Sequence, residues 1–109
     1  MKIKIYQIGP KTDIYGLMFV NLEFALKKGN GHIKESIYEL VYEGEVQTKS
    51  LEDIFYIFNM ARPADYRGRS LSVSDIVEVD ETGAFFCDSC GFQEIKFDGS
   101  KCQWRKFDE

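Results

Sequence analysis

The segment around Ser50 carries the pattern that most constrains the fold. Ser50 is a favoured N-cap residue, and Glu52 and Asp53 place carboxylates in the first turn, where the helix dipole favours negative charge. The apolar residues that follow have the i, i+3, i+4, i+7 spacing of one helical face: Leu51, Ile54, Phe55 and Phe58. Pro63 disfavours helical backbone at the residue before it. The sequence therefore predicts an amphipathic helix over residues 51–61.

Short segments with strand character surround this helix. The first of them, residues 2–8, alternates polar and apolar residues. A period of two predicts a strand with one packed face, formed by Ile3, Ile5 and Gln7, and one solvated face. Further strands are expected at 37–42, at 76–79 and 84–88 as a hairpin around the Asp80–Gly83 turn, and at 92–97.

Residues 14–27 allow two interpretations. Leu17, Val20 and Phe24 recur at helical spacing, and the two lysines and the Gly-Asn-Gly sequence that follow suit the end of a helix. Phe19 and Val20 would also suit a strand. We favour the helix, because the apolar positions form one broad helical face.

Length and composition indicate one folded domain. A chain of 109 residues is too short for two ordinary domains, and 44% hydrophobic residues with 15% aromatics suffice for a packed core. The expected fold class is α+β, with a mostly antiparallel sheet of four to five strands and two helices packed on one face. Residues 1–97 form this single domain, and residues 98–109 are expected to be a polar C-terminal tail.

The charge balance restricts the kinds of partner. With 14 basic and 18 acidic side chains the net charge is −4, which argues against a general nucleic-acid binder. A local basic patch remains possible, and an acidic chain is compatible with a basic partner surface. We find no apolar run of about 18 residues and no secretory leader pattern. Three cysteines fit a reducing compartment. The expectation is a cytoplasmic protein with no membrane partner.

Cys87 and Cys90 have the two-residue spacing of a zinc knuckle or a redox pair. A structural zinc site needs four ligands, and the other candidates, Cys102 and His32, stand at unrelated spacing. The alternative is two ordinary thiols at a hairpin turn, which we favour. His32 is the single histidine and has no nucleophile or carboxylate motif beside it. We therefore expect no catalytic residues, no cofactor, no metal and no enzymatic activity.

The loop over residues 62–75 is the segment with the most binding chemistry. Guanidinium groups, a ring and hydroxyls stand together here and could hold a carboxylate, a phosphate or a partner backbone. The structural alternative is that Arg67 or Arg69 pairs with Asp65 or Asp75 while the serines cap turns. The candidate partner-binding residues are Arg62, Asp65, Tyr66, Arg67, Arg69, Ser70, Ser72, Ser74 and Asp75.

The same loop carries a family resemblance. Residues 2–97 are similar to the YodL-like family, and the most specific part is the S-L-S-x-S-D sequence from Ser70 to Asp75. The resemblance also rests on Ile5-Tyr6-Gln7-Ile8, Phe58-Asn59, Pro63-Ala64-Asp65-Tyr66 and Cys87-Asp88-Ser89-Cys90-Gly91-Phe92. It implies an origin in Firmicutes or in their conjugative elements and phages, and it carries over no catalytic residues. The matching positions mark either a fold-defining turn or a site.

Two functions follow as expectations. The first is a non-catalytic protein-binding accessory factor from a mobile genetic element, which binds through the loop 62–75 and the adjoining hairpin. The alternative is a nucleic-acid or phosphate-ligand binding module that uses Arg62, Arg67 and Arg69 together with Tyr66. The sequence names neither the partner nor the oligomeric state.

Overall fold

The computed structural model describes residues 1–48 and 50–105. Its centre is strand β1 (Lys2–Ile8), which pairs in antiparallel fashion with β2 (Tyr38–Glu45) on one side and with β3 (Ile76–Val79) on the other. The hairpin of β3 and β4 (Gly83–Asp88) continues the sheet to β5 (Gly91–Ile95). This confirms the α+β class and the predicted hairpin.

The sheet has six strands in the order β5-β4-β3-β1-β2-β6, whereas we expected four to five. The additional strand, β6 (Gln103–Trp104), comes from the segment predicted only as a polar tail, and it pairs with β2 in parallel, so the sheet is mixed. A turn of 3-10 helix, η2 (Gly99–Lys101), leads into it. Two paired residues are too short a stretch for a period of two to be recognised in the sequence.

Helix α2 (Leu51–Met60) confirms the strongest sequence prediction. The Ser50 hydroxyl accepts the N–H of Asp53 at 3.2 Å, as an N-cap should. Ile54 and Phe58 are fully buried and pack on one face of the sheet, in a cluster that includes Ile5 and Val77. Leu51 is partly buried against the same cluster, whereas Phe55, the remaining residue of the predicted stripe, is 38% exposed.

Helix α1 (Leu22–Lys28) covers only the second half of the predicted 14–27 helix. Asn21 caps it by accepting the N–H of Phe24, and Gly29 ends it. Residues 14–20 form an irregular loop instead, because the Asp13 carboxylate accepts the N–H groups of Leu17 and Met18. Those donors are consequently withdrawn from any longer helix.

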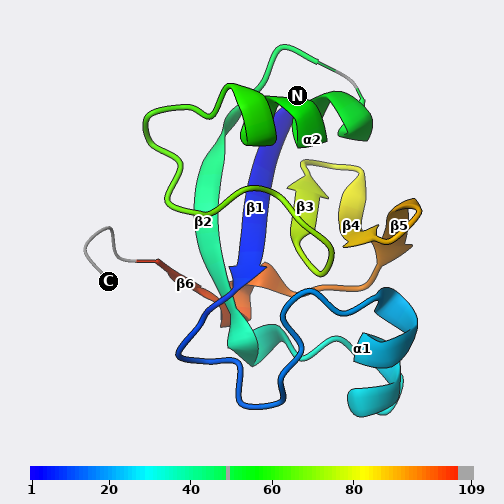
Figure 1. Ribbon diagram of the computed structural model, residues 1–109. Helices are drawn as coiled ribbons and strands as arrows, with labels where there is room; N and C mark the ends of the chain where they lie inside the picture. Colours follow the sequence, from blue (N-terminus) through cyan, green and yellow to red (C-terminus); the bar gives the residue numbers. More distant parts are fainter. Residues whose placement is uncertain (49, 106–109) are drawn as a thin grey trace.

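The expectation that both helices pack on one face is wrong. Successive strand residues point to opposite faces, and Ala25 of α1 belongs to a second cluster with Ile8, Ile76 and Phe86. Figure 1 shows α2 at one end of the sheet and α1 at the other. The second face of β1 is covered only in its later half, where Tyr6 and Ile8 are buried. Lys2 is exposed and Lys4 is partly exposed, so the predicted solvated face is present in the first half of the strand.

The remaining elements are short. A 3-10 turn, η1 (Glu35–Ile37), leads directly into β2. The loop 62–75 runs from α2 across the sheet to β3, and Figure 1 shows it passing over β1. None of the helices in the described part of the chain has the length and apolarity needed to cross a membrane.

Candidate functional site

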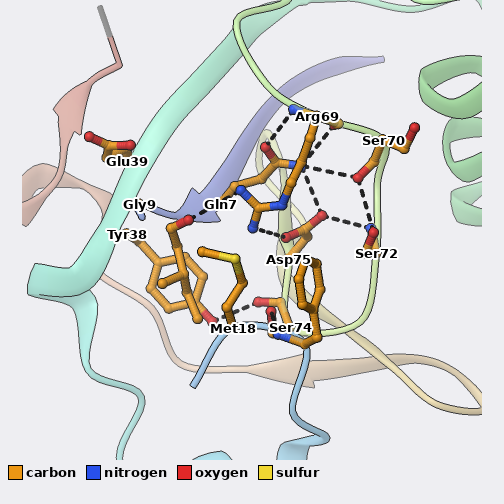
Figure 2. A network of polar contacts seen from close by, with 12 residues as sticks. Gln7, Gly9, Met18, Tyr38, Glu39, Arg69, Ser70, Ser72, Ser74 and Asp75 are labelled. Atoms are coloured by element: carbon orange, nitrogen blue, oxygen red, sulfur yellow. Dashed lines mark hydrogen bonds and ion pairs between the residues drawn. The ribbon is translucent and has the colours of Figure 1, made fainter. Parts of the chain in front are cut away.

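The loop 62–75 lies on the side chain of Gln7, which is fully buried in the sheet (Figure 2). Its amide Nε2 donates to the Asp75 carboxylate at 2.9 Å, to the Arg69 carbonyl at 3.0 Å and to the Tyr66 hydroxyl at 3.1 Å. Its Oε1 accepts the Arg69 N–H at 3.1 Å. One amide thus joins strand β1 to three residues of the loop.

Asp75 supplies the buried carboxyl group of this network. Its Oδ2 also accepts the Ser72 N–H at 2.7 Å, and its Oδ1 lies 3.7 Å from the Arg69 guanidinium (Figure 2). Burial raises the pKa of Asp75 to about 7, against the opposing effects of the Ser72 and Gln7 hydrogen bonds and of the Arg69 charge. Burial likewise lowers the pKa of Arg69. Among the arginine–aspartate ion pairs considered from the sequence, the structure contains the one between Arg69 and Asp75.

Ser74 connects the loop to the rest of the molecule. It is fully buried with a φ of 86°, in the left-handed region that few non-glycine residues adopt. Its Oγ accepts the Phe19 N–H at 3.0 Å, and its carbonyl accepts the Tyr38 hydroxyl at 2.6 Å. Its own N–H donates to the Cys87 carbonyl at 2.9 Å. Ser74 consequently joins the loop 14–20, β2 and β4.

The predicted binding residues therefore divide by exposure. Tyr66, Ser74 and Asp75 are buried in the network just described. Arg67, Arg69 and Ser72 are partly exposed, while Arg62, Asp65 and Ser70 are exposed. The S-L-S-x-S-D segment builds the fold in this structure. A partner can reach only the exposed and partly exposed residues of the loop.

A groove lies where the loop, α2 and the β4–β5 hairpin meet. Its volume is ≈ 310 Å³, and it is lined by Glu52, Phe55, Val73, Cys87, Asp88, Ser89, Gly91 and Phe92. Tyr56 and Met60 of the same helix are outside this lining, and their exposed fractions are 64% and 71%. Sequence analysis assigned Phe55 to the core stripe and did not predict that it would line a groove with Val73 and Phe92.

The three cysteines differ in how deeply their side chains are buried. Cys87 is buried, Cys90 is exposed and Cys102 is half-buried, and all three are free. Burial, with the nearby Asp75 and Asp88 charges, raises the pKa of Cys87 to about 12, so that its thiol stays protonated at neutral pH. Within residues 1–48 and 50–105, no group of three or more His, Cys, Asp or Glu side chains is placed to hold a metal ion.

Two aromatic side chains lie beside the arginines of the loop, although sequence analysis did not connect them. The Arg67 guanidinium lies 4.6 Å from the Trp104 ring centre, and the Arg69 guanidinium lies 5.2 Å from that of Phe19. Arg67 also donates to the Arg105 carbonyl at 3.0 Å. These partners are remote in sequence, so no local pattern predicts the contacts.

The sheet with its central strand β1, the two helices and a buried polar network beneath one loop define an α+β domain. Residues 2–97 match the YodL-like domain family. Since this match covers most of the chain, the protein belongs to that family, which confirms the resemblance. Neither a curated protein nor a solved structure matches the chain.

Proposed function

We propose that this protein is a non-catalytic binding domain that holds a partner protein in the groove between α2, Val73 and the β4–β5 hairpin. The observation that carries the proposal is the apolar lining of that groove, with Phe55, Val73 and Phe92 together in ≈ 310 Å³. Exposed apolar side chains that gather in one place mark interaction sites more often than scattered ones do.

The charges around the groove indicate the chemistry of the partner. Glu52 and Asp88 line it beside the apolar side chains, and the whole chain carries a net charge of −4. Complementary potentials favour a partner that is basic at this point. The fitting occupant is an apolar side chain with lysine or arginine close to it. A basic nucleic-acid-binding surface of a host enzyme has that character.

Binding is a better account than catalysis because the fold itself explains the perturbed titratable groups. Catalytic sites usually combine shifted pKa values with a cleft. Asp75, whose pKa is raised to about 7, is instead fully buried and bonded to Gln7 and Ser72. The raised pKa of Cys87 keeps this groove thiol protonated and therefore weakly nucleophilic.

The proposal retains the loop 62–75 and the hairpin as the binding region and changes which residues bind. Arg62, Asp65 and Ser70 remain as exposed residues of the loop between α2 and Val73. The distribution of the family supports the further proposal that the protein is a cytoplasmic accessory factor of a mobile genetic element in Firmicutes.

Site-specific photo-crosslinking tests the groove directly. A benzophenone side chain replaces Phe55 or Phe92, or Ile14 as an exposed control outside the groove, and each protein is irradiated in a nuclease-treated Firmicute lysate. We expect one protein to be crosslinked from positions 55 and 92 and not from position 14. Adding Phe55→Asp to the Phe92 crosslinker should abolish that product. The same products from all three positions, or none from the groove, would contradict the proposal.

A further inference from the structure

Large apolar side chains are exposed mainly at two places in the described part of the chain. Three of them belong to α2 and four to residues 14–24, namely Ile14, Tyr15, Phe19 and Phe24. Figure 1 shows the loop between β1 and α1, together with α1 itself, at the end of the sheet opposite to α2. We call residues 9–34 the α1 end. Its four exposed apolar side chains do not line the groove at α2.

The structure fixes the loop that carries three of these side chains. Leu17, in the middle of the loop, is buried in the second core cluster. The Asp13 carboxylate accepts the N–H groups of Leu17 at 2.7 Å and of the next residue at 3.0 Å. The loop is thus anchored by a buried side chain, while Ile14 and Phe19, which are 76% and 55% exposed, remain in solvent.

Phe19 has a backbone conformation that is costly for a bulky residue. Its φ is 71°, in the left-handed region. The hydrogen bond from its N–H to the Ser74 hydroxyl, at 3.0 Å, holds this conformation. Backbone strain of this kind often occurs at functional sites. Because the Phe19 ring is exposed, burial of the side chain does not explain why the strain is kept.

The α1 end is basic although the chain is acidic. Residues 9–34 contain four lysines and two acidic residues, which leaves ten basic and sixteen acidic side chains elsewhere among the 14 and 18 of the whole chain. Three of the lysines are exposed and the last is partly exposed: Lys11, Lys27, Lys28 and Lys34. The ammonium group of Lys34 lies 4.8 Å from the ring centre of Tyr15, and that of Lys28 lies 5.6 Å from that of Phe24. Cations and exposed rings therefore lie side by side at this end.

We infer that the α1 end binds the surface of a membrane that contains anionic lipids. Exposed apolar side chains enter the boundary between headgroups and acyl chains, where aromatic rings are favoured. Lysines contact the lipid phosphates, while their alkyl stems lie along apolar surface. The excess of lysine at this end selects an anionic surface over a neutral one.

Binding to a membrane surface is compatible with the lack of a spanning segment. We expected no membrane partner because the sequence contains no apolar run of about 18 residues. A run of that length is needed to cross a bilayer, whereas a surface contact needs only apolar side chains and cations on one part of the protein. The expectation therefore does not extend to the α1 end.

Co-sedimentation with sucrose-loaded vesicles tests the inference. With about 30% phosphatidylglycerol in phosphatidylcholine, half of the protein should be bound at about 0.1–1 mM lipid. Pure phosphatidylcholine vesicles should bind it at least about 10-fold less well, and about 0.5 M salt should weaken binding to the anionic vesicles by about 5-fold or more. No binding at about 5 mM anionic lipid, or equal binding to both kinds of vesicle, would overturn the inference.

Apolar substitutions compare the two ends of the molecule. The double variant Ile14→Gln, Phe19→Asn removes two apolar side chains without a change in charge, and asparagine tolerates the positive φ of position 19. Its binding to the anionic vesicles should be weaker by about 10-fold. Tyr56→Gln, Met60→Gln is the matched control on α2 and should bind like the wild type. An equal loss in both double variants, or none in the first, would overturn the inference.

Charge substitutions make the same comparison for the lysines. Lys27→Gln, Lys28→Gln should weaken vesicle binding by about 10-fold, since each lysine near an anionic surface strengthens binding by up to about 5-fold. Lys2→Gln, Lys4→Gln makes the same change of charge in β1 and should weaken binding by less than about 2-fold. Thermal unfolding verifies that all four double variants are folded. Equal losses would show that the net charge, and not the α1 end, determines binding, and would overturn the inference.

A protein partner at the α1 end is the competing explanation. In the photo-crosslinking experiment, one protein crosslinked at high yield from position 14 would identify such a partner and overturn the inference. The α1 end and the groove share no residue, so Ile14→Gln, Phe19→Asn should leave crosslinking from position 92 unchanged. Each proposal can consequently fail alone.

Discussion

The side chain of Gln7 stands where an isoleucine would continue the pattern of β1. Ile3 and Ile5 precede it at a spacing of two, and all three are buried. Buried amides require hydrogen-bond partners, and those of Gln7 all come from the loop 62–75 or from Arg105. At the residue scale, the loop therefore keeps its position through polar contacts as well as through apolar packing.

Gln7→Leu should lower the free energy of unfolding by about 2–5 kcal/mol. The variant keeps the volume and the apolar pattern of the strand, but leaves the Asp75 carboxylate and the Arg69 N–H without their buried partner. Urea denaturation measures the change. Gln93→Leu, at an exposed position of β5, is the matched control and should change the free energy of unfolding by less than about 0.5 kcal/mol. Similar values for both variants would contradict a stabilising role of the network.

Titration of Asp75 should make stability fall as pH rises. Its pKa is raised from 3.8 to about 7 in the folded protein, so between these values the folded state binds a proton that the unfolded state has lost. Its stabilising contribution is present below about pH 4 and is lost as pH rises through about 7, with a slope of up to about 1.4 kcal/mol per pH unit.

Asp75→Asn removes the titrating carboxyl group, so the difference between the wild type and this variant isolates the contribution of Asp75 to the pH dependence of stability. The difference in urea midpoint between the two proteins should favour the wild type progressively more as pH is lowered from 8 to 4. Parallel pH profiles of the wild type and the variant would show that Asp75 has an ordinary pKa in the folded state.

At the scale of elements, local chemistry decides which predictions succeed. Helix α2 and the β3–β4 hairpin could be predicted because their caps, turns and apolar spacing lie within the elements themselves. The 14–20 segment could not, because Asp13 takes its N–H groups and Ser74 holds Phe19 at positive φ. Apolar residues at helical spacing did not outweigh those contacts.

In the candidate site too, contacts between residues close in sequence could be predicted and contacts between remote residues could not. Arg69 and Asp75 are close in sequence, so their pairing could be considered beforehand, and the structure contains it. The contact of Arg67 with Trp104 and the meeting of Phe55 with Phe92 depend on how remote elements pack. Sequence thus indicated a pairing within the loop 62–75, but which of its side chains are exposed became visible only in three dimensions.

At the scale of the whole molecule, the last described residues complete the sheet although the family match ends at residue 97. Cys102 packs into the second core cluster, and Arg105 pairs with Glu39 of β2 at 2.7 Å. Truncation after Phe97 should therefore cost about 2 kcal/mol or more, because it uncovers apolar surface and the edge of β2.

Truncation after Arg105 is the matched control and keeps the contacts that η2 and β6 make within residues 1–48 and 50–105. Urea denaturation should give the wild-type midpoint for this longer protein and a lower one for the chain ending at Phe97. Amide hydrogen exchange should also become faster in β2 of the shorter chain, since the strand β6 that covers the edge of β2 is lost. Equal midpoints would show that the segment after residue 97 adds no stability.

The central position of β1 has a consequence for synthesis on the ribosome. This strand is synthesised before both of its neighbours, residues 38–45 and 76–79, and the residues that close the far side of β2 come later still. Until then, Ile3, Ile5 and Ile8 have no sheet to enter and are available to other nascent chains or to chaperones. The domain consequently cannot complete its sheet before β3 has emerged, and a pause after that point would favour correct strand pairing.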